Sequence, residues 1–232
     1  MEDNKINILQ KGYYLKNQLD NTGWENIIGN WLDDENFFSV MSKLINLSNA
    51  GKKFTPKMKH WFRPFVECKY DDVKVIFVNI GPYNKLYDAD GIPFSCTNTN
   101  KEHSLLGYIF DALEIDNPGY NRDVNLARWC NQGVLMLNLA ITVEINTTNN
   151  HFDLWKPFMQ NLFKKINEDK SDLIVVLFGN KTQSVKTLLN KQTIIDVKHP
   201  ATSTYKGKWD NNNLFNVINE KLINKNKKPI KW

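Results

Sequence analysis

Four short apolar runs, separated by segments with helical spacing, constrain the fold of this chain more than any other feature of its sequence. The runs cover residues 73–80, 133–143, 172–178 and 194–197, and each is dominated by Val, Ile, Leu or Phe. A continuous apolar run of this kind is typical of a strand that is buried on both faces. Strands that alternate with helices form a parallel or mostly parallel sheet with helices on both sides. The sequence therefore predicts an α/β fold with three layers, α/β/α, around a central four-stranded, mostly parallel sheet.

The segments between these runs carry apolar residues at the spacing of an α-helix. We expect helices within residues 24–45, 104–113, 125–130, 152–166, 180–189 and 213–223. Residues 1–20 show only weak periodicity. The chain has 232 residues, 41% of them hydrophobic, and neither a repeat nor a linker divides it. We therefore expect a single domain over residues 1–232, with residues 1–20 as a weakly defined N-terminal segment, or one domain with an N-terminal helical annex.

The composition excludes several classes of protein. No segment is long and apolar enough to cross a membrane, and the first residues lack the apolar core of a signal peptide. We therefore expect a cytoplasmic protein, or one of the nucleus or a viral factory if the source is eukaryotic or viral. The three cysteines, Cys68, Cys96 and Cys130, have no metal-ligand spacing, so we expect reduced thiols, no metal site and no cofactor. The net charge of +5 is compatible with binding to nucleic acid but does not require it, and we expect a monomer.

Polar residues mark all four expected strands. Residues 79–84 follow the first strand, Asn138 lies in the middle of the second, residues 179–180 end the third and His199 follows the fourth. The carboxyl ends of parallel strands meet at one edge of a sheet, where open α/β proteins bind their ligands. A buried amide such as Asn138 must be paired, and its donor and acceptor suit the edge of a pyrimidine ring. Two alternatives remain open, namely an Asn138 bonded to neighbouring backbone and a His199 that is a capped core residue.

The loop after the first strand has the composition of a pocket floor. The strand breaks at Gly81-Pro82-Tyr83 instead of entering a helix, and the chain returns to an apolar Ile92-Pro93-Phe94. Glycine lets the backbone approach a ligand closely, and proline rigidifies the loop that holds the aromatic ring. The alternative is a strand end with an ordinary turn.

Taken in order, these motifs resemble the uracil-DNA glycosylase superfamily, specifically its family-1 type. The matching segments are VKVIFVNIGPY, GIPFS, SLLGYIFDALE, ARWCNQGVLMLNLAITV, the helix of Trp155, LIVVLFGNKTQ, KHPATSTYKG and the terminal KKPIKW. They extend from about Trp24 to Trp232. The resemblance implies a monofunctional DNA N-glycosylase, which flips one nucleotide out of DNA and hydrolyses its N-glycosidic bond, leaving an abasic site. DNA, single-stranded or duplex with a flipped base, is the implied partner.

The resemblance also implies roles for individual residues. Phe94 would stack on the flipped base, Asn138 would read its Watson–Crick edge, and Tyr83 would wall off its C5 position. His199 would bond to the base carbonyl and stabilise the departing anion, because preorganised donors in a dry pocket lower the barrier. The residues expected to bind the base are Ile80, Gly81, Tyr83, Phe94 and Asn138.

Three segments of the chain would hold phosphates of the damaged strand, through backbone N–H groups and hydroxyls as much as through charge. They lie before the first strand, after the third and after the fourth. The residues expected to contact DNA are Pro56, Gly179, Asn180, Thr202, Ser203, Thr204, Tyr205 and Lys206.

The pattern departs from the family at three places. Gly81 stands where the family has the Asp that orients the attacking water, and Asn84 replaces the His that follows the Tyr. Residues 201–204 form a shorter loop without the family's Leu wedge, which should weaken extrusion from duplex DNA. An amide can position water, so Asn79 and Asn84 join His199 as candidate catalytic residues. Gly81 also enlarges the pocket, which favours a modified base.

Two functions follow from this balance of retained and altered residues. The first is a working glycosylase for uracil or a modified pyrimidine, favoured by the retention of His199, Asn138, Phe94 and Tyr83. The second is a catalytically impaired protein that binds DNA or a partner, such as a replication accessory factor, and it is favoured by the change at Gly81.

Overall fold

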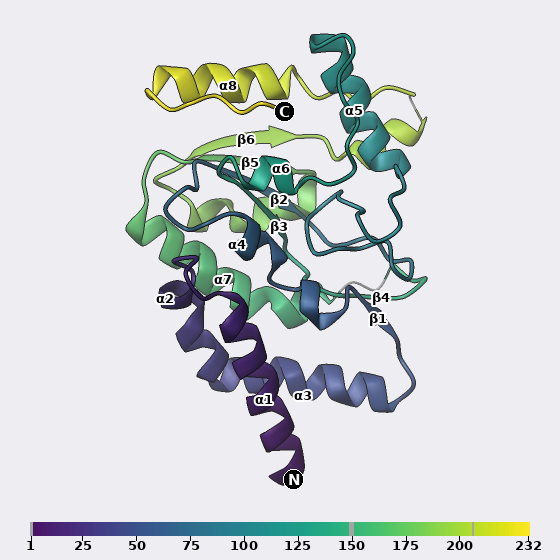
Figure 1. Cartoon of the computed structure of the whole chain (residues 1–232), viewed down its shortest axis with the longest axis vertical. Helices are drawn as coiled ribbons and strands as arrows, with labels where there is room; N and C mark the ends of the chain where they lie inside the picture. The colour runs from purple at the N-terminus through teal and green to yellow at the C-terminus, as the bar shows by residue number, and fades with distance from the viewer. Residues whose placement is uncertain (1, 149–150, 206) are drawn as a thin grey trace.

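The computed structural model describes residues 2–148, 151–205 and 207–232. Its central strands are β2 (Val75–Asn79), β3 (Val134–Asn138), β5 (Ile174–Phe178) and β6 (Thr193–Val197). They form one sheet in the order β3-β2-β5-β6 (Figure 1), and every pairing in it is parallel. The predicted α/β fold with a central four-stranded sheet is therefore confirmed.

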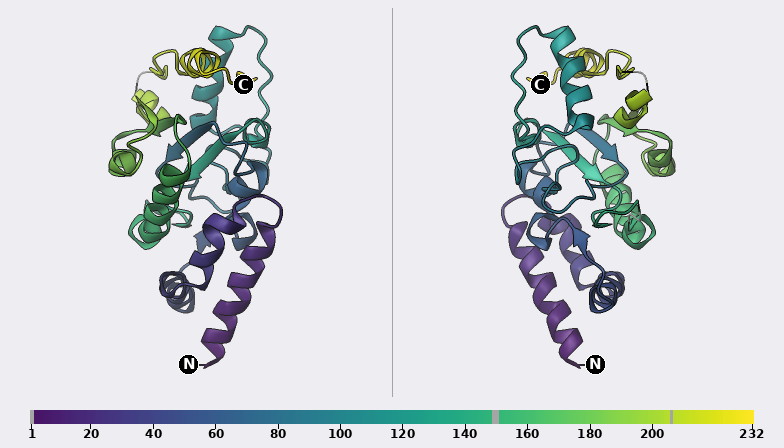
Figure 2. Two further views of the ribbon diagram at one scale, coloured as in Figure 1. Left: turned by 90° about the vertical axis from the view of Figure 1, so that its left-hand side faces the viewer. Right: turned by 90° about the vertical axis from the view of Figure 1, so that its right-hand side faces the viewer.

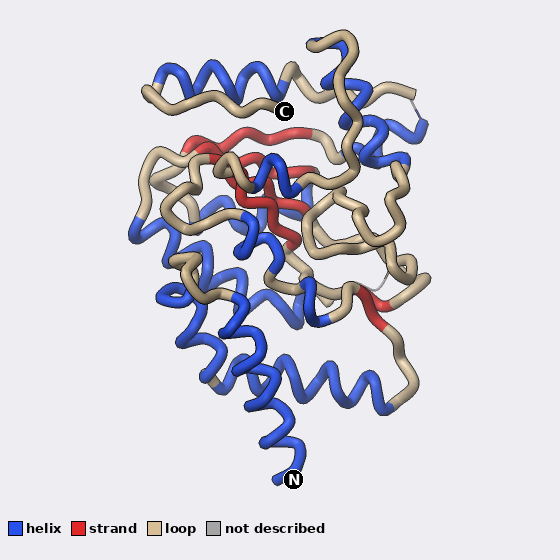
Figure 3. Tube along the Cα trace, in the orientation of Figure 1, coloured by secondary structure: helices blue, strands red, loops and turns tan. Residues whose placement is uncertain are grey.

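The remaining elements surround this sheet. The helical ones are α1 (Glu2–Gln18), α2 (Glu25–Ile28), α3 (Glu35–Asn49), α4 (Arg63–Glu67), α5 (Ser104–Asp116), α6 (Ala127–Cys130), α7 (Phe152–Asp169) and α8 (Leu214–Asn224), with the 3-10 helices η1 (Gly29–Asp33), η2 (Met58–His60), η3 (Asn180–Leu188) and η4 (Pro200–Tyr205). Two further strands, β1 (Phe54–Thr55) and β4 (Val143–Glu144), pair antiparallel in a small sheet apart from the central one (Figure 3). Within the described residues, no helix combines the length and the apolar character needed to cross a membrane.

Helices cover both faces of the central sheet and complete the three layers (Figures 1 and 2). Over one face lie α8 and the C-terminal residues, where the ring of Phe77 stacks on that of Trp232 at 5.8 Å. Over the other face lies α7, whose Phe158 stacks on Phe62 at 5.9 Å. Large aromatic rings bury more apolar area than other side chains, so the first contact ties the sheet to the C-terminal layer and the second ties α7 to the start of α4.

The N-terminal segment is more regular than its sequence suggests. Residues 2–18 form α1, which projects from the body of the molecule and packs along η1 and α3 (Figure 2). Its buried face consists of Ile8, Gly12, Leu15 and Leu19, at intervals of four, three and four residues. A Cβ atom at Gly12 would lie 3.1 Å from the ring of Phe37, so the contact itself requires a small residue. A glycine in the apolar stripe hides the helical period from hydropathy, which explains the weak signal.

The second apolar run is divided in the structure. The strand predicted over residues 133–143 is wrong in its second half, because β3 ends at Asn138 and residues 143–144 belong to β4. The buried Thr142 accepts a hydrogen bond from the indole of Trp155 at 2.8 Å and contacts Nδ1 of His151 at 2.8 Å. These bonds hold the chain as it turns from one sheet to the other. Asn138 is therefore the last residue of its strand and not a residue in its middle.

Candidate active site

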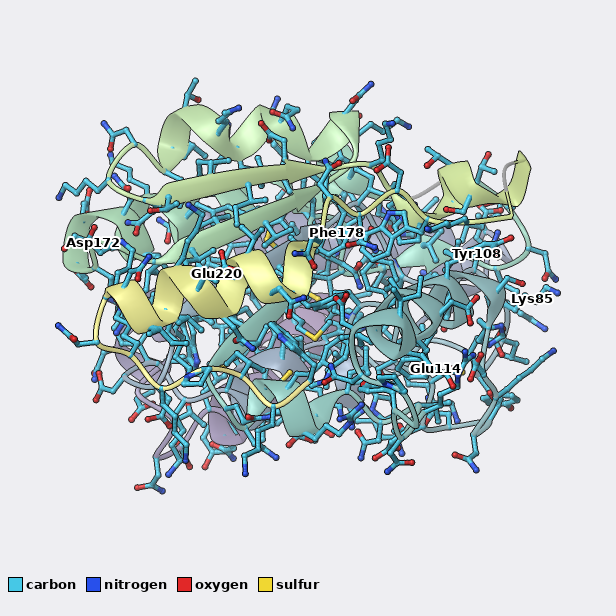
Figure 4. All side chains as sticks on the ribbon, turned by 90° about the horizontal axis from the view of Figure 1, so that it is seen from above. Lys85, Tyr108, Glu114, Asp172, Phe178 and Glu220 are labelled. Atoms are coloured by element: carbon cyan, nitrogen blue, oxygen red, sulfur yellow. The ribbon has the colours of Figure 1, made fainter. Side chains whose placement is uncertain are left out.

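The carboxyl ends of the parallel strands meet at one edge of the sheet, as the sequence predicted. Figure 4 shows Phe178, the last residue of β5, toward the side that carries Tyr108 of α5, whereas Asp172 lies at the opposite side. Ligands of open α/β sheets bind at this edge. The side chains of the candidate site all end or follow one of these strands.

Asn79 and Asn138 end two neighbouring strands in register. They are partners across β2 and β3, so their side chains point to the same face of the sheet. Nδ2 of Asn79 donates to Oδ1 of Asn138 at 2.9 Å and to the carbonyl of Gly81 at 3.0 Å. Both asparagines are buried. The alternative in which Asn138 bonds to neighbouring backbone is not found, since its partner among the described residues is the side chain of Asn79.

His199 completes this group from the end of β6. Its Nδ1 accepts the backbone N–H of Ala201 at 3.1 Å, which places the proton on the other ring nitrogen. Nε2–H therefore donates to Oδ1 of Asn79 at 2.9 Å. Burial lowers the pKa of His199 to about 4, so the imidazole is neutral at physiological pH. We call the linked side chains of Asn79, Asn138 and His199 the amide–histidine cluster.

Phe94 and Tyr83 stand beside this cluster. The ring of Phe94 lies 5.9 Å from that of His199 and 5.3 Å from that of Phe178. Its backbone has a φ of 66°, a left-handed conformation that is unusual for a bulky residue and that clusters at functional sites. The hydroxyl of Tyr83 donates to the Phe94 carbonyl at 3.0 Å. Burial raises the pKa of Tyr83 well above its ordinary value, so this donor keeps its proton.

An open hollow of about 490 Å³ also borders His199, and neither Asn79 nor Asn138 lines it. We call it the lysine groove; its lining residues are Gly179, Asn180, Lys181, Lys198, His199, Thr202, Lys208 and Asp210. Gly179 has a φ of 84°, and a Cβ atom on it would lie 3.1 Å from Cβ of His199. Glycine at this position thus lets β5 end close to the histidine.

Comparison with known protein families identifies the family of this chain. The family model described as the uracil DNA glycosylase superfamily matches residues 65–223, which is more than half of the chain. The chain belongs to the uracil-DNA glycosylase superfamily. This membership supports DNA glycosylase function in general.

Individual relatives agree with the family. The uracil-DNA glycosylase of Yersinia pestis (strain Pestoides F) is 28% identical over 214 residues, which cover 90% of this chain and 94% of the relative. The crystal structure of mimivirus uracil-DNA glycosylase has a TM-score of 0.83 at 24% identity and covers 94% of this chain and 88% of its own. Another mimivirus structure, solved in complex with UGI, has a TM-score of 0.82 at 23% identity and covers 90% and 87%. At these identities the two solved structures establish the fold.

Most of the residues that the family resemblance singled out lie together. His199, Asn79 and Asn138 form one hydrogen-bonded cluster, and Phe94 and Tyr83 stand beside it. The groups predicted to contact DNA that line the lysine groove are Gly179, Asn180 and Thr202. Ile80 and Gly81 continue the chain directly from Asn79 and are half-buried.

Other predicted residues lie elsewhere. Nδ2 of Asn84 donates to the Thr147 carbonyl at 2.6 Å, so this amide is bonded to the loop after β4 and not to the cluster. Pro56 lines a different hollow, between α1 and α3. Ser203 is 1% exposed, and its hydroxyl is turned into the interior. The side chains of Thr204 and Tyr205 and all of Lys206 lie outside the described residues.

Sequence reasoning missed three lysines of the groove, Lys181, Lys198 and Lys208. Lys198 is paired with Asp210 at 2.8 Å. In a chain with 30 Lys and Arg residues, single lysines carry little signal. Their nearness to the strand ends, beside residues 179–180 and His199, was the only sequence feature that could have distinguished them.

Proposed function

We propose that this protein is a DNA glycosylase that hydrolyses the N-glycosidic bond of a uracil or modified pyrimidine flipped out of DNA. One observation carries the proposal: a half-buried, neutral His199 directs its N–H donor to the amide that also pairs with Asn138, beside the ring of Phe94. Membership of the superfamily supports it.

His199 supplies the main catalytic interaction in this proposal. Cleavage of the bond builds negative charge on the base and positive charge on the sugar. A neutral imidazole whose Nε2–H is already oriented stabilises the base anion without any rearrangement, and one such donor is typically worth about 3 kcal/mol. Because the pKa of His199 is about 4, the donor is uncharged at neutral pH and acts through a hydrogen bond that strengthens as the charge develops.

The lysine groove would hold the DNA strand next to this donor. Lys181 and Lys208 offer positive charge, and the backbone of Gly179 and Asn180 offers N–H groups at the end of β5. Such contacts position the strand without reading its sequence. The base itself would then be read only by the side chains at the strand ends.

A second candidate function is DNA binding without cleavage. Gly81 supplies no carboxylate to orient water, and Asn84 is bonded to Thr147. The hydrogen bonds of His199 and Asn138 are made to Asn79, so the described conformation presents a filled cluster beside an open groove. This combination favours a protein that holds a strand and leaves its bases intact.

One assay separates the two functions. Single-stranded DNA that carries uracil, or a modified pyrimidine, is incubated with the protein, and abasic sites are then cleaved with alkali. We expect cleavage with the wild-type protein and at least about 100-fold slower cleavage with His199→Ala, while both proteins retain their DNA affinity. If no base is released from any of the substrates although DNA is bound, the non-catalytic function is the correct one.

A further inference from the structure

The side chain of Asn79 makes every hydrogen bond that the proposed function assigns to the base. Its Oδ1 accepts Nε2–H of His199 at 2.9 Å, and its Nδ2 donates to Oδ1 of Asn138 at 2.9 Å. A third bond, from Nδ2 to the carbonyl of Gly81 at 3.0 Å, fixes the amide plane. Asn79 is 5% exposed, so solvent does not compete for these bonds.

A carboxamide and the edge of a pyrimidine carry the same hydrogen-bonding groups in the same order. In Asn79 a carbonyl oxygen and an N–H group sit on either end of one C–N bond, and uracil repeats this arrangement at O2, C2 and N3–H. The acceptor faces His199 and the donor faces Asn138. We propose that Asn79 is an internal occupant of the base site, and that a base enters only when this side chain swings away. This inference rests on the proposed function, because it takes His199 and Asn138 as the groups that read the base.

An internal occupant also determines which base is accepted. A base that displaces Asn79 must offer an acceptor to His199 and a donor to Asn138, or it leaves buried polar groups unpaired. Uracil and thymine-like bases offer both. Cytosine carries a lone pair at N3, so at that position it offers no donor to Oδ1 of Asn138. Asn79 thus raises the cost of entry for every base, and only a base that repeats its bonds to His199 and Asn138 offsets that cost.

Removal of the amide tests this role directly. We would measure the affinity for free uracil by NMR titration, and excision from uracil-containing single-stranded DNA, in the wild type, Asn79→Gly and Asn79→Ala. Asn117→Ala, at an exposed position after α5, is the matched control. We expect both Asn79 variants to bind uracil at least about ten-fold more tightly, because the base no longer competes with an internal hydrogen-bonding group.

The outcomes separate this inference from the proposed function. Tighter uracil binding by a folded Asn79 variant, without excision by any protein, supports the internal occupant and overturns the glycosylase. If the wild type excises uracil, and neither Asn79 variant binds uracil more tightly or excises it faster, the glycosylase is supported. The inference that Asn79 occupies the base site is then overturned. Thermal melting confirms that each variant is folded. Two different substitutions are used in case one of them prevents folding.

A second inference comes from the long loop between β2 and α5, which has two buried carboxylates in contrasting surroundings. Asp90 is fully buried and paired: it accepts hydrogen bonds from Ser95, Thr97 and the backbone N–H of Ile92, and Arg63 lies 2.7 Å away. Asp88 is also buried, yet its carboxylate accepts no hydrogen bond from any described residue. A buried carboxylate that accepts no hydrogen bond is costly, so the surroundings of Asp88 require another explanation.

The surroundings of Asp88 are those of a metal site. One ligand atom each of Asp88, Cys96 and His103 lies within 4.8 Å of the other two. Nε2 of His103 lies 3.1 Å from the Asp88 carboxylate, and among the described residues it has no hydrogen-bond partner. Cys96 is a buried thiol outside any disulfide, and its Sγ lies 3.0 Å from Oγ1 of Thr99. Two ligands bound to one Zn²⁺ ion stand roughly 3–4 Å apart, so the three ligand atoms would need only a small approach to bind one ion.

We infer that Asp88, Cys96 and His103 bind a divalent metal ion of the zinc type, with the fourth position open to water. A carboxylate and a thiolate neutralise the charge of Zn²⁺, and neutral imidazole completes a ligand set that zinc prefers. The site would fasten a loop that has no regular secondary structure of its own. It also bears on the active site, because the ring of His103 lies 4.6 Å from that of Tyr83.

Metal binding can be measured without reference to any activity. Protein stripped with a chelator is titrated with Co²⁺, and its absorption bands are recorded, while Zn²⁺ is tested for its effect on the melting temperature. We expect thiolate-to-cobalt absorption and a higher melting temperature in the wild type and in Cys68→Ser, a control at another buried thiol. Both effects should vanish in Cys96→Ser and His103→Ala. Absence of both effects in the wild type, or their persistence in the two ligand variants, overturns the site.

Discussion

The two sides of His199 differ in what they offer to a DNA strand. On one side, Nε2 is bonded to Asn79, whose buried side chain lies between His199 and Asn138. On the other side, the same residue borders the lysine groove, an open hollow of about 490 Å³. Under the proposed function, binding of the strand and admission of the base would therefore be separate steps. The groove is open, whereas Asn79 occupies the cluster and would have to move before a base enters.

The difference follows from the residues at the strand ends. β5 is followed by Gly179, where a Cβ atom would lie 3.1 Å from Cβ of His199 and which lines the open groove. β2 ends in Asn79, whose side chain fills the space between His199 and Asn138. One strand is thus followed by a residue without a side chain, and another ends in a residue whose side chain fills the space beside it. The chemistry of the site depends on both residues.

Substitution of His199 should have the largest effect, because this residue belongs both to the amide–histidine cluster and to the lysine groove. We expect His199→Ala to lower single-turnover excision by about 100-fold to 1,000-fold, the loss that follows removal of one preorganised donor. DNA affinity should change little, since the groove keeps its lysines and its backbone donors. Quench-flow kinetics and fluorescence anisotropy measure the two effects. A parallel loss of affinity and rate would show that the two sides do not act separately.

Titration of His199 should have the next largest effect, on stability. The pKa is about 4 in the folded protein and 6.5 in the unfolded chain, so between these values the unfolded chain binds more protons. The stability that the neutral imidazole contributes is therefore full above pH 6.5 and is lost as the pH falls toward 4. The loss is at most about 3 kcal/mol.

Denaturant unfolding at pH 7 and pH 4.5 checks this prediction, with His199→Asn as the reference. The reference is necessary because burial also lowers the pKa values of His60 and His151. The wild type should lose more stability than the variant on acidification. Equal losses would mean that His199 does not titrate at low pH.

Loss of a single lysine from the lysine groove should have the smallest effect. It should weaken DNA binding and leave the amide–histidine cluster unchanged. We expect Lys181→Ala and Lys208→Ala each to weaken binding to single-stranded DNA, and to reduce the slope of log affinity against log salt by about 0.7. Excision of DNA that is already bound should stay unchanged. Lys221→Ala, on α8, is the control at a residue outside the groove. A reduced rate on bound DNA would place the lysine in the reaction itself.

Much of the fold was predictable because its signals are local. The apolar runs 73–80 and 172–178 each contain a strand of the central sheet, the run 194–197 covers all but the first residue of another, and parallel strands must end at a common edge. The convergence of Asn138 and His199 followed from that rule. The helix α1 escaped detection because Gly12 interrupts its apolar stripe, and the run 133–143 concealed a break after Asn138.

The details of the site depend on register and packing, which a single sequence does not contain. Asn79 was expected to position water, but its pairing across the sheet with Asn138 brings its amide between that residue and His199. Asn84, five residues later, is drawn to Thr147 by the path of the loop. Likewise, the spacing of Cys96 in the sequence gave no sign of metal binding, because Asp88 and His103 approach it only through the fold of an irregular loop.

The hydrogen bond from the hydroxyl of Tyr83 to the carbonyl of Phe94 has a consequence for the size of substrate that the protein tolerates. It ties the side chain of Tyr83 to the backbone of Phe94 across the loop, so a shift of one residue acts on the other. Under the proposed function, a purine, with its second fused ring, would have to displace both residues together. Bases with a single ring would therefore be preferred.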